Sequence, residues 1–193
     1  SFLFDGKLAR GNSFQAGQIG HIPVVKDGIL CACGQKGCLN TIASGWSILA
    51  DLKLSVPPAS SPLRLVNDGI LLEDVINRAK NGDKVVERAA FKSGHALGQM
   101  LSGLYQALAP EVILTVGPIA EISSYVDGII SAASENNINL PLFTPEDQKF
   151  KSVASSAALH GLSEFLFSPR FRLTDLMPNI SIQAGPDLRE TSP

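Results

Sequence analysis

The stretch AGQIGHIPVVKDGILCACGQKGCLNTIAS, residues 16–44, contains every cysteine of this 193-residue chain. The three cysteines, Cys31, Cys33 and Cys38, are odd in number and closely spaced, which does not suit a disulfide framework. Clustered thiolates suit metal coordination, which calls for one more ligand.

We expect His21 to supply the fourth ligand. If Asp27-Gly28 forms a two-residue hairpin turn, the register pairs Ile22 with Cys33 and places His21 opposite Gly34, beside the cysteines. Three thiolates and one imidazole form a closed four-coordinate set that is typical of structural Zn²⁺ and leaves no position for a catalytic water. The alternative is three buried apolar cysteines with a histidine nearby by chance. The predicted zinc ligands are His21, Cys31, Cys33 and Cys38.

A structural metal would hold the loop around it in place. Gln18 and Asn40 flank the predicted ligands, so their side chains would be fixed beside the ion. Polar side chains held in this way predict a small-molecule site next to the metal.

The composition is that of a globular α/β protein: 45% of residues are hydrophobic and the net charge is −2. The chain has no run of basic residues, which argues against a nucleic-acid-binding surface on this stretch. It also has no apolar run of the roughly 18 residues that a membrane helix needs. Free, clustered thiols favour a reducing compartment, so we expect a cytoplasmic protein.

The N-terminal residues predict a β-hairpin. Phe2–Phe4 and Lys7–Ala9 flank Asp5-Gly6, a dipeptide that favours a two-residue turn. Because the chain opens inside this hairpin and without Met, we expect it to be one lobe of a larger protein.

Apolar periodicity indicates how the rest of the chain is organised. Residues 111–116 predict a buried strand and residues 151–154 a weaker one, whereas the proline-rich residues 55–68 predict a loop. Glycines 94, 98 and 103 of the long helix predict close packing against a neighbour. The helices are expected at residues 39–53, 72–80, 83–108, 122–130 and 155–167.

This order of elements predicts an α/β fold with a mixed sheet. We expect one α/β lobe over residues 1–168, with the metal loop at residues 21–38, and a tail over residues 169–193.

Residues 16–44 resemble the signature of the ROK family (repressors, uncharacterised reading frames and sugar kinases), in which a G-H motif precedes C-x-C-G-x-x-G-C-L. The resemblance implies the C-terminal lobe of an actin-like, ribonuclease-H-like ATPase-type fold. It also implies that His21 lies against a sugar hydroxyl as well as the zinc ion. The family has glutamates that bind sugar hydroxyls where this chain has Gln18 and Asn40, which predicts an altered or lost sugar pocket.

The resemblance leaves regulators and kinases open, and three features favour a regulator. Family kinases have a run of glycines near the nucleotide where this chain has TVGP, residues 115–118. Residues 40–44, NTIAS, resemble the repressors' ETIAS, and both sugar-binding acids are replaced. The catalytic Asp of family kinases belongs to the other lobe, so we do not expect this chain to be an enzyme by itself.

We therefore expect the effector-sensing and dimerisation lobe of a regulator similar to the N-acetylglucosamine- and glucose-responsive repressors. The resemblance implies a sugar, a sugar phosphate or a transport-system protein as effector, a homo-oligomer, and DNA binding only through a separate N-terminal domain. Two alternatives remain: the C-terminal lobe of an ATP-dependent sugar kinase, and a zinc-stabilised protein-docking module that binds no sugar.

Overall fold

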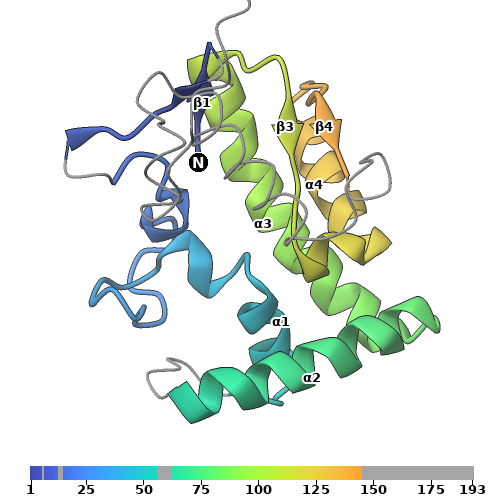
Figure 1. The fold of residues 1–193 in the computed structure, drawn as a ribbon. Coiled ribbons are helices and arrows are strands. Elements are labelled where there is room, and N and C mark those ends of the chain that lie inside the picture. Colours follow the sequence, from blue (N-terminus) through green and yellow to red (C-terminus); the bar gives the residue numbers. More distant parts are fainter. Residues whose placement is uncertain (6, 13–14, 56–61, 145–193) are drawn as a thin grey trace, which may run out of the picture. The chain divides into compact units, whose positions relative to one another are not determined.

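The computed structural model describes residues 1–144, except Gly6, residues 13–14 and residues 56–61, and all of the described residues lie in one unit, Ser1–Gln148. Helices and short strands are mixed along the chain (Figure 1). In chain order the elements are β1 (Leu3–Phe4), β2 (Lys7–Leu8), the 3-10 helices η2 (Ile19–His21) and η3 (Leu39–Thr41), α1 (Gly45–Asp51), α2 (Pro62–Lys80), α3 (Lys84–Leu108), β3 (Ile113–Leu114), the 3-10 helix η4 (Pro118–Glu121), α4 (Ser123–Glu135) and β4 (Leu142–Phe143).

Helices α3 and α4 lie side by side and pack backbone to backbone (Figure 1). A Cβ on Gly94 of α3 would overlap the carbonyl oxygen of Tyr125 in α4, and one on Gly98 would overlap that of Ile129. On the other side of the contact, a Cβ on Gly128 would overlap the carbonyl oxygen of Phe91. Only glycine allows the two backbones to come this close, which confirms the predicted packing at Gly94 and Gly98.

The hydrophobic core is built from side chains of α1, α2, α3 and α4, with Ile122 directly before α4, and most of them are aliphatic. Burying such a side chain contributes about 1.5–3 kcal/mol. The buried core residues are Ile48, Leu49, Val75, Ile76, Val86, Ala89, Ala90, Leu101, Ile122, Tyr125 and Ile129.

Several elements of the structure agree with the predictions from the sequence. Strands β1 and β2 pair antiparallel with Phe4 opposite Lys7, which confirms the predicted two-residue turn. Helix α3 begins at Lys84, where the Asp83 carboxylate accepts hydrogen bonds from the backbone N–H groups of Val85 (3.0 Å) and Val86 (3.3 Å). An aspartate in this position satisfies N–H groups that have no partner inside the helix.

The helix predicted over residues 39–53 is wrong in its start. Residues 39–41 form η3 instead, and α1 begins only at Gly45. Ser44 and Ser47 explain the new start, because each side chain accepts a hydrogen bond from the backbone N–H of the other in a capping box.

The predicted loop over residues 55–68 is wrong from residue 62 onward, because α2 begins at Pro62 and runs to Lys80. Proline is favourable in the first turn of a helix, where its missing N–H would have no helical partner. The helix predicted over residues 72–80 is the second half of α2. At Gly103 of α3, a Cβ would meet no described residue within 4 Å, so the described part of the chain does not supply the close packing predicted there.

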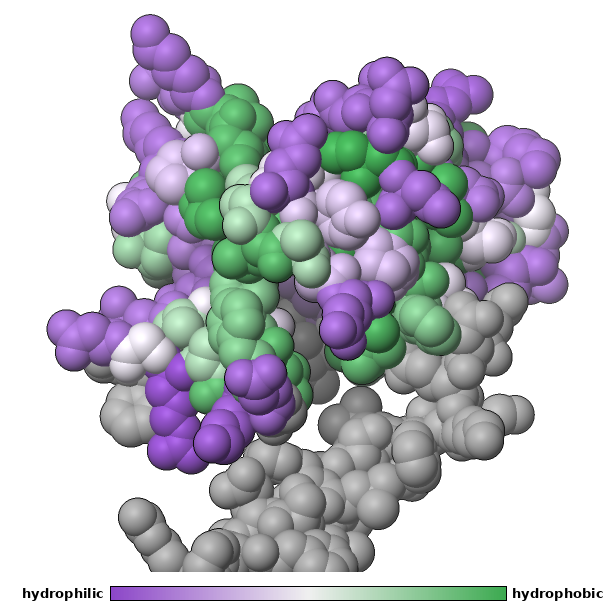
Figure 2. Space-filling model, turned by 90° about the horizontal axis from the view of Figure 1, so that it is seen from above, coloured by the Kyte–Doolittle hydropathy of each residue, from purple (hydrophilic) through white to green (hydrophobic). Residues whose placement is uncertain are grey.

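The predicted buried strand over residues 111–116 is also corrected. Within the described residues it shortens to β3, Ile113–Leu114, which pairs parallel with β4 and not in one sheet with β1 and β2. Leu114 and Val116 are 60% and 71% exposed. Figure 2 shows hydrophobic residues gathered in patches on one face, bordered by hydrophilic side chains. Among the described residues β3 has one neighbouring strand, and its apolar side chains remain largely exposed.

The predicted strand over residues 151–154, the helix over residues 155–167 and the tail over residues 169–193 lie outside the described residues. In the part of the chain that the structure describes, no helix has both the length and the apolar character required to cross a membrane.

Candidate metal centre

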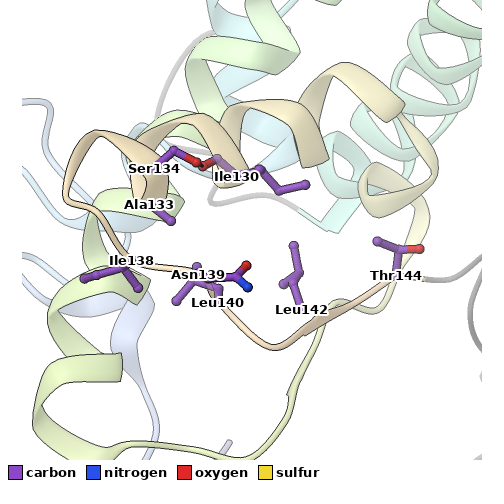
Figure 3. Close-up of a pocket in the computed structure, with 8 residues that line it drawn as sticks. All are labelled: Ile130, Ala133, Ser134, Ile138, Asn139, Leu140, Leu142 and Thr144. Atoms are coloured by element: carbon purple, nitrogen blue, oxygen red, sulfur yellow. Dashed lines mark hydrogen bonds between the residues drawn. The ribbon is translucent and has the colours of Figure 1, made fainter.

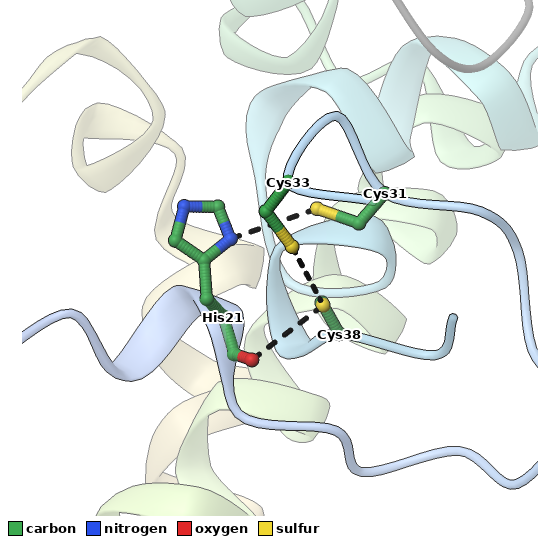
Figure 4. Close-up of side chains that lie close together, drawn as sticks. All are labelled: His21, Cys31, Cys33 and Cys38. Atoms are coloured by element: carbon green, nitrogen blue, oxygen red, sulfur yellow. Dashed lines mark hydrogen bonds between the residues drawn. The ribbon is translucent and has the colours of Figure 1, made fainter. Parts of the chain in front are cut away.

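The four predicted ligands come together in one cluster (Figure 4). Cys31 Sγ lies 3.6 Å from His21 Nδ1, and Cys33 Sγ lies 3.6 Å from Cys38 Sγ. The candidate ligand atoms of all four residues lie within 4.8 Å of one another. His21 therefore lies close enough to the three cysteines for all four residues to bind one metal ion.

The strand register that brings His21 to the cysteines differs from the predicted register. The predicted pairing of Ile22 with Cys33 is wrong: Pro23 instead bridges Cys38, and the Leu39 N–H donates to the Ile22 carbonyl (2.9 Å). The Gly28 N–H donates to the Val25 carbonyl (3.2 Å), which closes a local turn where a two-residue hairpin was expected. His21 is therefore placed beside Cys38 rather than opposite Gly34.

A tight turn carries Cys31 and Cys33. The Gly34 N–H donates to the Cys31 carbonyl (2.9 Å), and the Cys31 N–H donates to the Gln35 carbonyl (2.7 Å). Leu30 and Lys36 then form an isolated antiparallel bridge. The turn holds two cysteines on one side of the cluster while Cys38 approaches from the other.

The environments of two thiols differ sharply. Desolvation, together with the neighbouring sulfurs of Cys33 and Cys31, raises the pKa of Cys38 to about 12. At Cys33, which is exposed, a hydrogen bond from the Gln35 backbone N–H lowers the pKa. A buried sulfur of this kind carries charge easily only next to a cation, and metal coordination deprotonates a thiol outright.

The donor set and its spacing fit zinc. Zinc–sulfur bonds of about 2.3 Å in a tetrahedron place neighbouring sulfurs about 3.8 Å apart, close to the 3.6 Å between the sulfurs of Cys33 and Cys38. Three soft sulfur ligands and an imidazole favour zinc over magnesium or calcium. The ion would cross-link η2, which ends at His21, to the turn that carries Cys31 and Cys33 and to Cys38, directly before η3.

Gln18 and Asn40 lie at the two short helices next to His21 and Cys38. Gln18 precedes η2, which ends at His21, and Asn40 lies in η3, directly after Cys38. The two short helices contact each other, and a Cβ on Gly20 would lie 3.6 Å from the Asn40 Cβ. Both side chains are exposed, so they are free to reach a ligand from solvent.

One supporting residue was not identified from the sequence. The buried hydroxyl of Tyr125 in α4 donates to the carbonyl oxygen of Ala43 (2.9 Å), in the segment that follows η3. Desolvation raises the pKa of Tyr125. This hydrogen bond ties the segment after the metal cluster to the helical core. The sequence did offer a signal for this role: a tyrosine at a buried position of a helix needs a hydrogen-bond partner for its hydroxyl.

A pocket of about 260 Å³ lies between α4 and the segment that leads through β4 (Figure 3). The Ser134 hydroxyl faces inward, but it donates to the Ile130 carbonyl of its own helix (2.9 Å). None of the described lining residues is titratable. Its lining residues are Ile130, Ala133, Ser134, Ile138, Asn139, Leu140, Leu142 and Thr144.

Comparison with known proteins identifies the class. Residues 1–165 match the ROK family. The chain belongs to this family, and the cluster at residues 21–38 lies within the matched region.

Particular relatives include kinases and a regulator. The chain is 29% identical over 130 residues to an N-acetylmannosamine kinase from Yersinia pestis (strain Pestoides F), a match covering 67% of this chain and 41% of that protein. A ROK family glucokinase from Streptomyces griseus, solved with glucose and AMPPNP, is 26% identical with a TM-score of 0.55, over 75% of this chain and 47% of that one. A ROK family transcriptional regulator, a homologue of the Escherichia coli MLC protein, is 24% identical with a TM-score of 0.54, over 72% of this chain and 37% of that one.

These matches confirm the expected family, and the solved relatives agree with the expected actin-like ATPase-type fold. The chain spans about two fifths of the length of the curated relatives it matches. Because regulators and kinases share this fold, the likeness by itself does not separate the two functions.

Proposed function

We propose that this chain is the effector-sensing and dimerisation lobe of a ROK-family, sugar-responsive transcriptional regulator stabilised by zinc. The connection between β3 and α4 carries the proposal, because family kinases have a run of glycines there that allows the backbone to approach the nucleotide. The proposal includes a sugar, a sugar phosphate or a transport-system protein as effector, and a second copy of the chain as partner. DNA would be bound by a separate N-terminal domain.

The β3–α4 connection is poorly suited to a nucleotide. Gly117 is its one glycine, with a φ of 101°, and Pro118 follows directly as the first residue of η4. Proline lacks an N–H and therefore cannot donate to a phosphate. Val116, 71% exposed, presents a branched side chain to solvent where the kinases have bare backbone.

The residues beside the metal cluster support binding of a sugar more than its phosphorylation. The amides of Gln18 and Asn40 each offer a donor and an acceptor to sugar hydroxyls. Hydrogen bonds to a carboxylate are roughly twice as strong. Weaker bonds suit reversible sensing, whereas phosphoryl transfer depends on accurate positioning of one hydroxyl.

A sugar kinase is the second candidate, and the identity to N-acetylmannosamine kinase favours it. In that case this lobe would complete a hexose site together with the lobe that carries the catalytic Asp. Gly117 would then be the only glycine of the described β3–α4 connection available to the nucleotide.

The test uses the intact protein that contains this chain. Calorimetric titration with glucose, N-acetylglucosamine, N-acetylmannosamine and their 6-phosphates measures binding, and release of ADP from ATP and Mg²⁺ measures turnover. We expect one of these ligands to bind without turnover. Sugar-dependent release of ADP would establish the kinase, and failure of every sugar and sugar phosphate to bind would favour the docking module.

A pair of variants tests the placement of the sugar site. Gln18→Glu with Asn40→Glu restores the family's acids and should tighten binding about tenfold, equivalent to about 1.4 kcal/mol. Asn12→Glu with Gln15→Glu adds the same charge at exposed positions nearby and should leave affinity unchanged. Equal effects of the two pairs would show that Gln18 and Asn40 do not contact the sugar.

A further inference from the structure

Two of the three cysteines are arranged as a pair. The Sγ atoms of Cys33 and Cys38 lie 3.6 Å apart, whereas Cys31 Sγ faces His21 Nδ1 at the same distance (Figure 4). Cys33 is exposed, and Cys31 and Cys38 are buried. The Cys33 sulfur can therefore be reached from solvent, and the Cys38 sulfur lies 3.6 Å from it.

We propose that Cys33 and Cys38 are an oxidation site, at which a peroxide converts the two thiols to a disulfide and releases the metal ion. This modification goes beyond the proposed regulator function. Its disulfide step stands on the geometry of the two sulfurs, and its metal-release step rests on the proposed zinc centre.

The reaction balances in two steps. The Cys33 sulfur attacks hydrogen peroxide, gaining one oxygen as sulfenic acid while the other oxygen leaves as water. The Cys38 sulfur then attacks the Cys33 sulfur, forming the S–S bond and expelling a second water. Two thiols and one peroxide thus give one disulfide and two waters, with sulfur oxidised and peroxide oxygen reduced.

The surroundings of Cys33 favour this order. Its exposure gives peroxide access, and no described residue lies within 4 Å of a Cβ placed on neighbouring Gly34. A disulfide requires the sulfurs to approach to about 2.0 Å. Rotation of the exposed Cys33 side chain can close that gap while the buried Cys38 stays in place.

Disulfide formation would dismantle the metal centre. It removes two of the four ligands and leaves only Cys31 and His21 facing each other. A structural zinc site with two ligands lost no longer has a closed donor set. The turn that carries Cys31 and Cys33 would then be held by the new covalent bond instead of by the ion.

The sequence allows the disulfide to be located in the wild-type chain. Trypsin cleaves after Lys26, Lys36 and Lys53, which places Cys31 and Cys33 on one peptide and Cys38 on the next. After hydrogen peroxide treatment and alkylation of remaining thiols, mass spectrometry without reduction should show peptides 27–36 and 37–53 linked, with the alkyl group on Cys31. Dithiothreitol should separate them again.

Three results would overturn the proposal: a linkage within peptide 27–36, an alkyl group on Cys33 in the linked pair, or the absence of any linkage after peroxide. In Cys33→Ser the linkage should be lost. If it persists there, Cys31 is the partner and the assignment is wrong.

A zinc-sensitive dye, read in parallel, separates the two halves of the proposal. We expect one zinc released for each disulfide formed. Linkage without zinc would support the disulfide and contradict the zinc centre. Bound zinc with no linkage would contradict the disulfide and leave the proposed regulator function intact.

Discussion

The backbone of Gly37 packs directly against that of Val25. The Gly37 carbonyl accepts hydrogen bonds from the N–H groups of Val25 (3.1 Å) and Val24 (2.8 Å), and a Cβ on Gly37 would overlap the Val25 carbonyl oxygen. Gly37 also has a φ of +72°, which side chains disfavour. This contact, next to Cys38, sets the register that brings His21 to the cysteines.

We therefore expect Gly37→Ala to weaken metal binding and lower the thermal midpoint of unfolding. Backbone strain alone costs about 1–2 kcal/mol, and the overlap with Val25 adds to it. Gly34→Ala is the matched control, because Gly34 has a φ of +89° in the same loop but open space around it. If the two variants lose metal and stability equally, the contact with Val25 is not what fixes the loop.

The glycines of α3 should respond in opposite directions to the same substitution. Gly94→Ala places a methyl group on the Tyr125 carbonyl and should destabilise the protein by about 1–3 kcal/mol or more. Gly103→Ala, exposed and unobstructed, should stabilise it by about 0.5–1 kcal/mol because alanine is the better helix former. Urea unfolding measures both, and destabilisation by Gly103→Ala would argue that another chain covers this face.

Removal of the Tyr125 hydroxyl should loosen the segment around Ala43, which follows the cluster of candidate ligands. Tyr125→Phe leaves the Ala43 carbonyl without the 2.9 Å hydrogen bond and should cost about 1–3 kcal/mol. The control Tyr105→Phe removes the same hydroxyl from a half-buried tyrosine of α3 and should destabilise the protein much less. Faster amide exchange at residues 41–45 in Tyr125→Phe alone would report the loosening directly, and unchanged exchange would contradict it.

Asp83 should make stability depend on acid pH. The guanidinium of Arg78, with the Asp83 Oδ2 at 2.8 Å from its Nη2, and the N–H groups of Val86 and Val85 lower the pKa of Asp83. A lowered folded-state pKa means that the stabilisation is present above the unfolded value of about 3.9 and is lost as pH falls through the folded value.

The variant Asp83→Asn keeps a capping oxygen but loses this charge. It should be less stable than the wild type at neutral pH and equally stable in strong acid. Thermal unfolding across the acid range measures the difference, and a gap between the two proteins that is independent of pH would refute the role of the charge.

What could be predicted from the sequence depended on local chemistry. The turn at Asp5-Gly6, the start of α3 after Asp83 and the close packing at Gly94 each follow from the preferences of a few neighbouring residues. The cluster of candidate ligands was predicted from spacing, because thiolates and imidazole have few other reasons to lie close together.

Features that depend on distant contacts were predicted less well. The register around His21 depends on Gly37 meeting Val25, and Asp27-Gly28 gave a misleading local signal for a two-residue hairpin. The exposure of Leu114 depends on how many strands flank β3, which its apolar sequence does not specify. Proline in residues 55–68 suggested a loop, yet Pro62 begins a helix.

The central claim is that His21, Cys31, Cys33 and Cys38 hold a zinc ion that organises this lobe. X-ray absorption at the zinc edge, together with elemental analysis, tests it most directly on protein purified without added metal. The account predicts one zinc per chain, bound by three sulfurs and one nitrogen, and loss of both metal and stability in Cys33→Ser. A well-folded protein with no metal, or a zinc ion bound mainly by oxygen, would contradict it.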